Sequence, residues 1–78
     1  MEGAIGVFKR KLGFRITQLR SERGLTQQVL ADRLGYRDRQ IINRYEKEGA
    51  NPTAYMLVQL ANALEVSVDE LLDFTELE

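Results

Sequence analysis

Apolar residues recur at spacings of three and four along almost the whole sequence, and this periodicity limits the chain to helices. No stretch sustains the apolar/polar alternation of a half-buried strand, and no Asn-Gly or Asp-Gly hairpin turn occurs. The only proline, Pro52, lies in the one obvious loop. The sequence therefore predicts an all-α fold, a compact five-helix bundle, with helices at about 8–23, 27–34 and 38–47, after Thr53 and after Ser67.

Residues that start and stop helices flank these segments. The expected stops are Gly24 and Gly35, the expected N-caps are Thr26, Asp38 and Thr53, and Ser67 with Glu70 forms a capping box. The inward positions of the five segments form the predicted core: Phe8, Leu12, Ile16, Leu19, Leu30, Ala31, Leu34, Ile42, Tyr45, Leu57, Leu60, Ala61, Leu64, Val68, Leu71 and Leu72.

The chain has 78 residues, enough for one domain with one modest core. We expect a flexible arm at residues 1–7, the folded domain at 8–74 and a tail at 75–78. Neither cysteine nor histidine is present, so we expect no disulfide, no metal, no cofactor and no enzymatic activity. The longest apolar run, residues 54–58, is too short to span a bilayer, and we expect a soluble cytoplasmic protein associated with the nucleoid of a prokaryote or a phage-infected cell.

The net charge of −1 is divided unequally along the chain. Residues 1–47 hold all 11 lysines and arginines and have a net charge of +6, whereas residues 48–78 hold seven acidic residues and no basic one. Such a division indicates an anionic partner for the first half, or simply two solvated faces of opposite sign.

The outward positions of the predicted third helix suit the major groove of DNA. Arg39 and Arg44 can bind guanine O6 and N7 or a phosphate, and Gln40 and Asn43 can pair with adenine N6 and N7. Any exposed helix face is commonly rich in arginine and glutamine, so this helix alone would favour an ordinary solvated surface.

Wider sequence context favours DNA. The "R-x-x-x-G-L-T-Q-x-x-L-A-x-x-L-G" run of residues 20–35, the "I-x-R-Y-E" run of residues 42–46 and the "L-A-x-A-L-x-V-S-x-D-E-L" run of residues 60–71 occur together with Pro52. This combination resembles the Xre-like helix-turn-helix family of Cro and the lambdoid phage repressors. The resemblance covers residues 12–73 and implies a lambda repressor-like DNA-binding domain, in which the second helix crosses the DNA backbone and the third lies in the major groove.

The same resemblance implies roles for individual residues. It assigns Arg39, Gln40, Asn43 and Arg44 to base contacts, Gln27, Arg37, Lys47 and Asn51 to phosphate contacts, and Arg20 with Glu46 to a structural salt bridge between the first and third helices. The chain departs from the family pattern by one extra residue between Gly35 and Ile42, by a Gly49 that comes one place late, and by an acidic Glu48 after the recognition helix.

The resulting hypothesis is a sequence-specific double-stranded DNA-binding transcriptional regulator, either a repressor or a small autoregulating controller. A homodimer is expected, because one such module seldom reads enough DNA alone. The apolar residues Leu71, Leu72, Phe74 and Leu77 are candidates for the dimer interface; alternatively, Leu71 and Leu72 close the core and the other two are disordered. The alternative function is an antitoxin or interaction module that binds a protein partner through the acidic C-terminal half.

Overall fold

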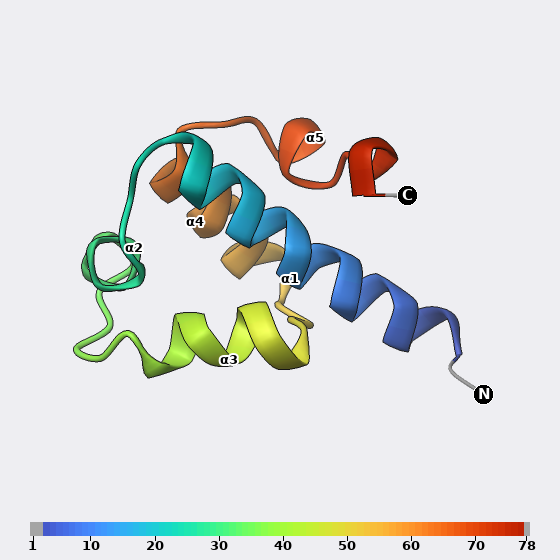
Figure 1. Cartoon of the computed structure of the whole chain (residues 1–78), viewed down its shortest axis with the longest axis horizontal. Helices are drawn as coiled ribbons and strands as arrows, with labels where there is room; N and C mark the ends of the chain where they lie inside the picture. The colour runs from blue at the N-terminus through green and yellow to red at the C-terminus, as the bar shows by residue number, and fades with distance from the viewer. Residues whose placement is uncertain (1–2, 78) are drawn as a thin grey trace.

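The computed structural model describes residues 3–77 and is built of helices (Figure 1). They are α1 (Ala4–Glu22), α2 (Gln27–Arg33), α3 (Gln40–Glu48), α4 (Ala54–Leu64), α5 (Val68–Leu71) and the short 3₁₀ helix η1 (Thr75–Leu77). The predicted all-α fold with five α-helices is confirmed, and no strand occurs between residues 3 and 77. No helix in this range is long and apolar enough to cross a membrane.

The first helix begins earlier than predicted. Ala4 is its first residue, and the Val7 amide donates to the Gly3 carbonyl at 3.1 Å, so residues 4–7 are helical rather than part of an arm. The arm residues 1 and 2 lie outside the described residues. Phe8 explains the extension, since its ring packs edge-to-face on Phe74 with centroids 5.9 Å apart. Once that turn is fixed, each preceding residue adds a hydrogen bond at little further cost.

The predicted caps are present with one shift. The Thr26 and Thr53 hydroxyls accept from the amides of the third residue along, and Ser67 and Glu70 form the capping box. Asp38 does not cap its helix in the expected position, because α3 begins at Gln40. Its carboxylate instead accepts from the Gln40 amide at 2.9 Å, which closes the turn before the helix.

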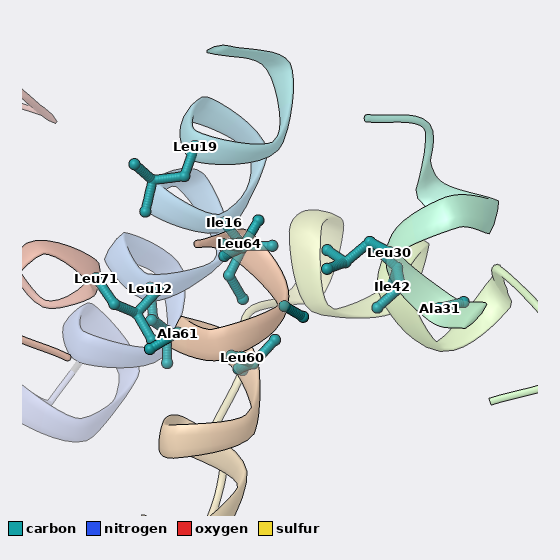
Figure 2. Close-up of a cluster of buried hydrophobic side chains, with 12 residues drawn as sticks. Leu12, Ile16, Leu19, Leu30, Ala31, Ile42, Leu60, Ala61, Leu64 and Leu71 are labelled. Carbon is teal, nitrogen blue, oxygen red and sulfur yellow. The ribbon is translucent and has the colours of Figure 1, made fainter. Parts of the chain in front are cut away.

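Side chains from all five α-helices meet in one core (Figure 2). The fully buried large residues are Leu12, Ile16, Leu30, Ile42, Leu60, Leu64 and Leu71. Several predicted core residues instead lie half-buried at its rim: Phe8, Leu34, Tyr45, Leu57, Val68 and Leu72. Short helices α2 and α3 thus owe their position to burial against α1 and α4, since helices of this length are unstable alone.

The described C-terminal residues do not match either sequence-based alternative fully. Leu71 has no exposed surface, so its predicted role in a dimer interface is wrong: it fills the core instead. Phe74 is half-buried against Phe8, and residues 75–77 form η1. Leu72 and Leu77 keep some exposed surface.

Helices α1 and α3 approach each other closely through two glycines. A Cβ at Gly13 would collide with the Tyr45 carbonyl oxygen, and one at Gly49 would lie 2.8 Å from the carbonyl of Lys9. The Ala50 amide donates to that same carbonyl at 3.0 Å. The late Gly49 therefore ends α3 with a φ of 94° at the point where the chain touches α1.

Candidate nucleic-acid interface

Helix α3 has one buried face and one exposed face. Ile42 is fully buried, and Ile41 and Tyr45 pack at the edge of the core. Gln40, Arg44 and Lys47 follow one another at spacings of four and three, so they lie on one side of the helix, and all three are exposed. Helix α3 itself lies along an outer edge of the molecule (Figure 1).

The remaining predicted contact residues surround this face. Arg39 is exposed at the N-cap of α3, and Arg37 is exposed in the turn before it. Asn51 is exposed in the loop after the helix, while Asn43 is half-buried at its inner margin. Apart from Gln27, described below, the predicted base and phosphate residues thus fall along α3 and its two flanking loops.

Two arginines outside α3 are held by contacts within the protein. Arg15 is only 8% exposed and donates from Nε to the Glu70 carbonyl at 2.9 Å. Arg33 donates to the Ala63 carbonyl at 2.8 Å and pairs with Glu65 at 2.9 Å. The sequence did not distinguish these side chains from potential DNA contacts, because their acceptors are mostly backbone carbonyls that only folding brings near. The cations on α3 and on the turn before it are exposed to solvent, where an anion can reach them.

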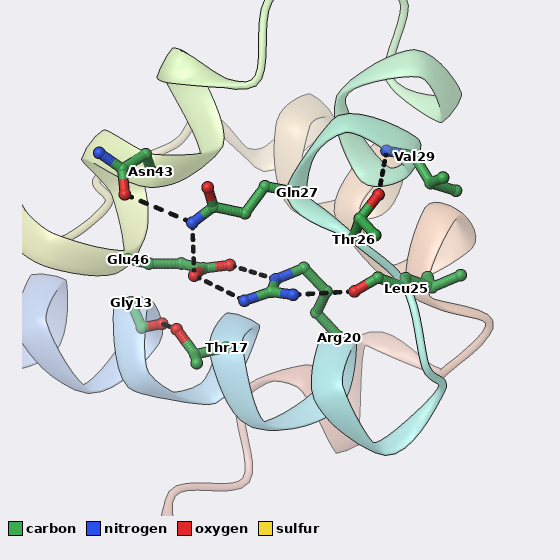
Figure 3. Close-up of polar contacts among 9 residues, drawn as sticks. All are labelled: Gly13, Thr17, Arg20, Leu25, Thr26, Gln27, Val29, Asn43 and Glu46. Atoms are coloured by element: carbon green, nitrogen blue, oxygen red, sulfur yellow. Dashed lines mark hydrogen bonds and ion pairs between the residues drawn. The ribbon is translucent and has the colours of Figure 1, made fainter.

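A predicted salt bridge fixes the orientation of α3 (Figure 3). Arg20 Nε lies 2.7 Å from Glu46 Oε2 and Nη2 lies 3.1 Å from Oε1, while Nη1 donates to the Leu25 carbonyl at 2.8 Å. The two side chains are 16% and 7% exposed. This bidentate pair joins α1, the segment before α2 and α3, and a guanidinium held by a carboxylate fork leaves little freedom to rotate.

Gln27 extends this network toward the exposed face. Its Nε2 donates to Glu46 Oε1 at 3.0 Å and makes a longer contact of 3.4 Å with Asn43 Oδ1 (Figure 3). Both amide hydrogens are thus directed into the protein, although the family resemblance assigned this residue to phosphate. Its backbone N–H lies in the first turn of α2, where a helix offers no acceptor of its own.

The longer turn between α2 and α3 is held by contacts that the sequence analysis missed. The Tyr36 amide donates to the Ala31 carbonyl at 2.9 Å, and its hydroxyl donates to Met56 Sδ at 3.8 Å. The Gln28 side-chain amide donates to the Arg37 carbonyl at 3.3 Å. Burial, and after it a hydrogen bond with Tyr36, raises the pKa of Tyr45 on the inner side of α3. These contacts set the register in which Arg39 and Gln40 begin the helix.

Comparisons with known proteins agree with this geometry. Residues 16–71 match the helix-turn-helix family HTH_3. An uncharacterized HTH-type transcriptional regulator, y4dJ of Sinorhizobium fredii, is 37% identical over 68 residues, which are 87% of each chain. Two helices joined by a turn, of which the second has an exposed polar face, are the motif of helix-turn-helix DNA-binding regulators of transcription. The chain belongs to this HTH_3 family, and it is a DNA-binding transcriptional regulator.

Similar solved structures include small regulators of comparable length. The restriction-modification controller protein C.AhdI from Aeromonas hydrophila has 34% sequence identity and a TM-score of 0.70, over 80% of this chain and 92% of its own. The restriction-modification controller protein C.Esp1396I has 32% identity and a TM-score of 0.72, over 91% of both chains. A hypothetical transcription factor, NHTF from Neisseria, has 26% identity and a TM-score of 0.73, over 83% of this chain and 74% of its own.

Proposed function

We propose that this protein binds double-stranded DNA sequence-specifically and acts as a repressor or as a small autoregulating controller. The observation that carries the proposal is the exposed face of α3, where Gln40, Arg44 and Lys47 lie together while the opposite face is locked by the Arg20–Glu46 pair. A helix held this rigidly can present its side chains to base edges without losing much conformational entropy on binding. The two restriction-modification controllers, similar over most of their length, support the controller role.

The side chains divide into base and phosphate contacts. Arg39, Gln40, Asn43 and Arg44 are the proposed base contacts, and Arg37, Lys47, Asn51 and the backbone N–H of Gln27 are the proposed phosphate contacts. Arginine and the two amides carry the donor and acceptor groups that distinguish base pairs in the major groove. Lysine contributes charge without sequence preference. In this proposal the protein catalyses no reaction and acts in the cytoplasm.

A homodimer on a two-fold DNA site is part of the proposal. Two copies would place their α3 helices one helical turn of DNA apart, about 34 Å. With Leu71 in the core, the proposed self-contact is formed by Leu72, Phe74 and Leu77. On α4, Tyr55 and Val58 add apolar surface that is 71% and 46% exposed and that a second copy would cover.

The base contacts are tested by selecting bound fragments from random DNA. Wild-type protein should enrich a two-fold symmetric motif. Arg39→Ala and Gln40→Ala should each relax the preference at one position of each half-site, with about 1–3 kcal/mol of discrimination lost there. If both variants select the same motif as the wild type with the same strictness, Arg39 and Gln40 are not base contacts.

The phosphate contacts are tested by salt dependence. Lys47→Ala should weaken binding to all sites alike and reduce the slope of log K against log salt by about 0.9 per protomer, because one contact no longer releases a counterion. Arg23→Ala removes the same charge from the far end of α1, where the guanidinium reaches the Glu65 carbonyl at 3.3 Å, and is the matched control. Equal slopes for Lys47→Ala and the wild type would remove Lys47 from the interface.

The alternative of an antitoxin with an acidic binding surface is less well supported. Three acidic side chains of the second half are used internally: Glu65 pairs with Arg33, Glu70 caps α5, and Glu76 accepts from Gln18 at 3.2 Å. Purified protein that ignores DNA at low salt but retains a basic protein partner through residues 65–78 would favour this alternative over a regulator.

A further inference from the structure

The hydrogen-bond network behind α3 has a fixed polarity. Arg20 can only donate, and Glu46 as a carboxylate can only accept. Gln27 must therefore turn its NH₂ group, not its carbonyl oxygen, toward Glu46, at the observed 3.0 Å. The charged end of the network thus decides the orientation of the Gln27 amide, which in general is difficult to assign from shape alone.

This polarity passes on to Asn43. The same Gln27 nitrogen faces Asn43 at 3.4 Å, so the Asn43 atom that meets it must be the acceptor, Oδ1. Figure 3 shows Oδ1 turned toward Gln27 and the Asn43 amide nitrogen turned away from the network. Rotating the Asn43 amide by half a turn would oppose two donors and lose the contact. The group that Asn43 turns outward is therefore its NH₂ donor.

An asparagine that presents only its NH₂ group recognises different base atoms from one that presents both its NH₂ group and its oxygen. Bidentate pairing with adenine requires the asparagine oxygen to accept from the N6 amino group. Oδ1 is turned toward Gln27 and the NH₂ group away from it, so Asn43 presents its donor rather than both groups. The NH₂ group suits an acceptor in the major groove, which is guanine O6, thymine O4 or a purine N7.

We propose that Asn43 donates to a base acceptor, a keto oxygen or a purine N7, rather than accepting from the adenine amino group, and that Gln27 is the positioning residue that imposes this choice. The inference rests on the proposed function, since it needs α3 in the major groove. It departs from the adenine pairing that the residue type alone suggests. Arg20 on α1 holds Glu46, Glu46 orients the Gln27 amide on α2, and Gln27 orients Asn43. Residues that do not touch the DNA would thus determine which base Asn43 prefers.

The experiment begins with the base pair that Asn43 contacts, identified as the position whose preference disappears in Asn43→Ala. Within the selected site, that pair is then altered one atom at a time. The two candidate acceptors are replaced separately: the keto oxygen by sulfur, a weak acceptor, with 4-thiothymine or 6-thioguanine, and the purine N7 by carbon, with 7-deazaguanine or 7-deazaadenine. One of the two replacements should weaken wild-type binding roughly five- to tenfold and Asn43→Ala binding far less. Removing the amino group, with purine in place of adenine or 2-pyrimidinone in place of cytosine, should affect both proteins equally.

Gln27→Ala supplies the second arm. Without Gln27 the Asn43 amide can turn, so this variant should tolerate loss of that acceptor and become sensitive to loss of the amino group. Gln59→Ala, a glutamine on α4 outside the network, should behave as wild type. Thermal unfolding shows whether Gln27→Ala is folded, and the base analogues with wild-type protein test the inference even if it is not.

The possible outcomes distinguish failure of this inference from failure of the proposed function. If the protein selects no DNA motif, the proposed function and this inference are both wrong. If a motif is found but the Asn43-dependent pair responds to loss of the amino group, or Asn43→Ala changes no position, this inference alone is wrong.

Discussion

Gly49→Ala is expected to lower the free energy of unfolding by about 4 kcal/mol, a large part of the stability of a domain this small. Two effects combine. The backbone at Gly49 has φ 94° and ψ 160°, a region nearly confined to glycine, and holding alanine there costs about 1–3 kcal/mol. The new Cβ would also lie 2.8 Å from the Lys9 carbonyl, and forcing α1 and α3 apart costs about 1–3 kcal/mol more. Urea unfolding followed by circular dichroism measures the sum.

Two other glycines separate the effects. Gly35 also has a positive φ, 81°, but a Cβ added there would meet nothing within 4 Å, so Gly35→Ala should cost only about 1–2 kcal/mol. Gly13 lies within α1 without a positive φ, and Gly13→Ala should show the collision with the Tyr45 carbonyl alone. Gly13→Ala combined with Gly49→Ala should cost less than their sum, because both separate the same helices. Equal losses for Gly35→Ala and Gly49→Ala would mean that the close approach contributes nothing.

The helices and their caps were predictable because they are local. Thr26, Thr53 and the Ser67–Glu70 box act on amides within three residues, so their geometry is largely written in short stretches of sequence. The end of α2, before the longer turn, was also predictable from the local sequence. Gly35 followed by Tyr36 is the pattern of a Schellman motif, in which an apolar residue packs after the glycine, and the Tyr36 amide indeed reaches the Ala31 carbonyl.

Features that depend on contacts between distant residues were not predictable. The start of α1 depends on Phe74, far along the chain, and the burial of Arg15 depends on the Glu70 carbonyl. Helical spacing placed Leu71 on an apolar face but could not tell a core position from an interface position. Spacing of three and four reports which residues share a face, whereas the depth of that face is set by the other helices.

The candidate site divides in the same way. The exposed positions of Gln40, Arg44 and Lys47 follow from the inward direction of Ile42, which helical spacing predicts directly. The family resemblance supplied the partner of Arg20, and the structure confirms that pair. The hydrogen bonds of the Gln27 side chain could not be foreseen, because they are made to two residues of another helix, Asn43 and Glu46. The residue type alone is equally consistent with a phosphate contact and with a contact inside the protein.

Glu46→Ala is expected to destabilise the protein by about 3–5 kcal/mol, because removing one member of a buried pair leaves the other charge without compensation. The Arg20 guanidinium, 16% exposed, would keep only the Leu25 carbonyl, and the Gln27 amide would lose its strongest acceptor. Glu65→Ala is the matched control: its pair with Arg33 is 37% and 64% exposed, and loss of such an exposed pair should cost about 1 kcal/mol or less.

A second variant tests the cause rather than the size of this loss. Replacing both partners, Arg20→Met with Glu46→Leu, removes the pair without stranding a charge and should restore most of the stability lost in Glu46→Ala. Thermal and urea unfolding of all four proteins gives the comparison. The double variant should nevertheless bind DNA with relaxed preference, because Gln27 and Asn43 would no longer be oriented by Glu46. A double variant as unstable as Glu46→Ala would show that shape, and not the stranded charge, makes this position sensitive.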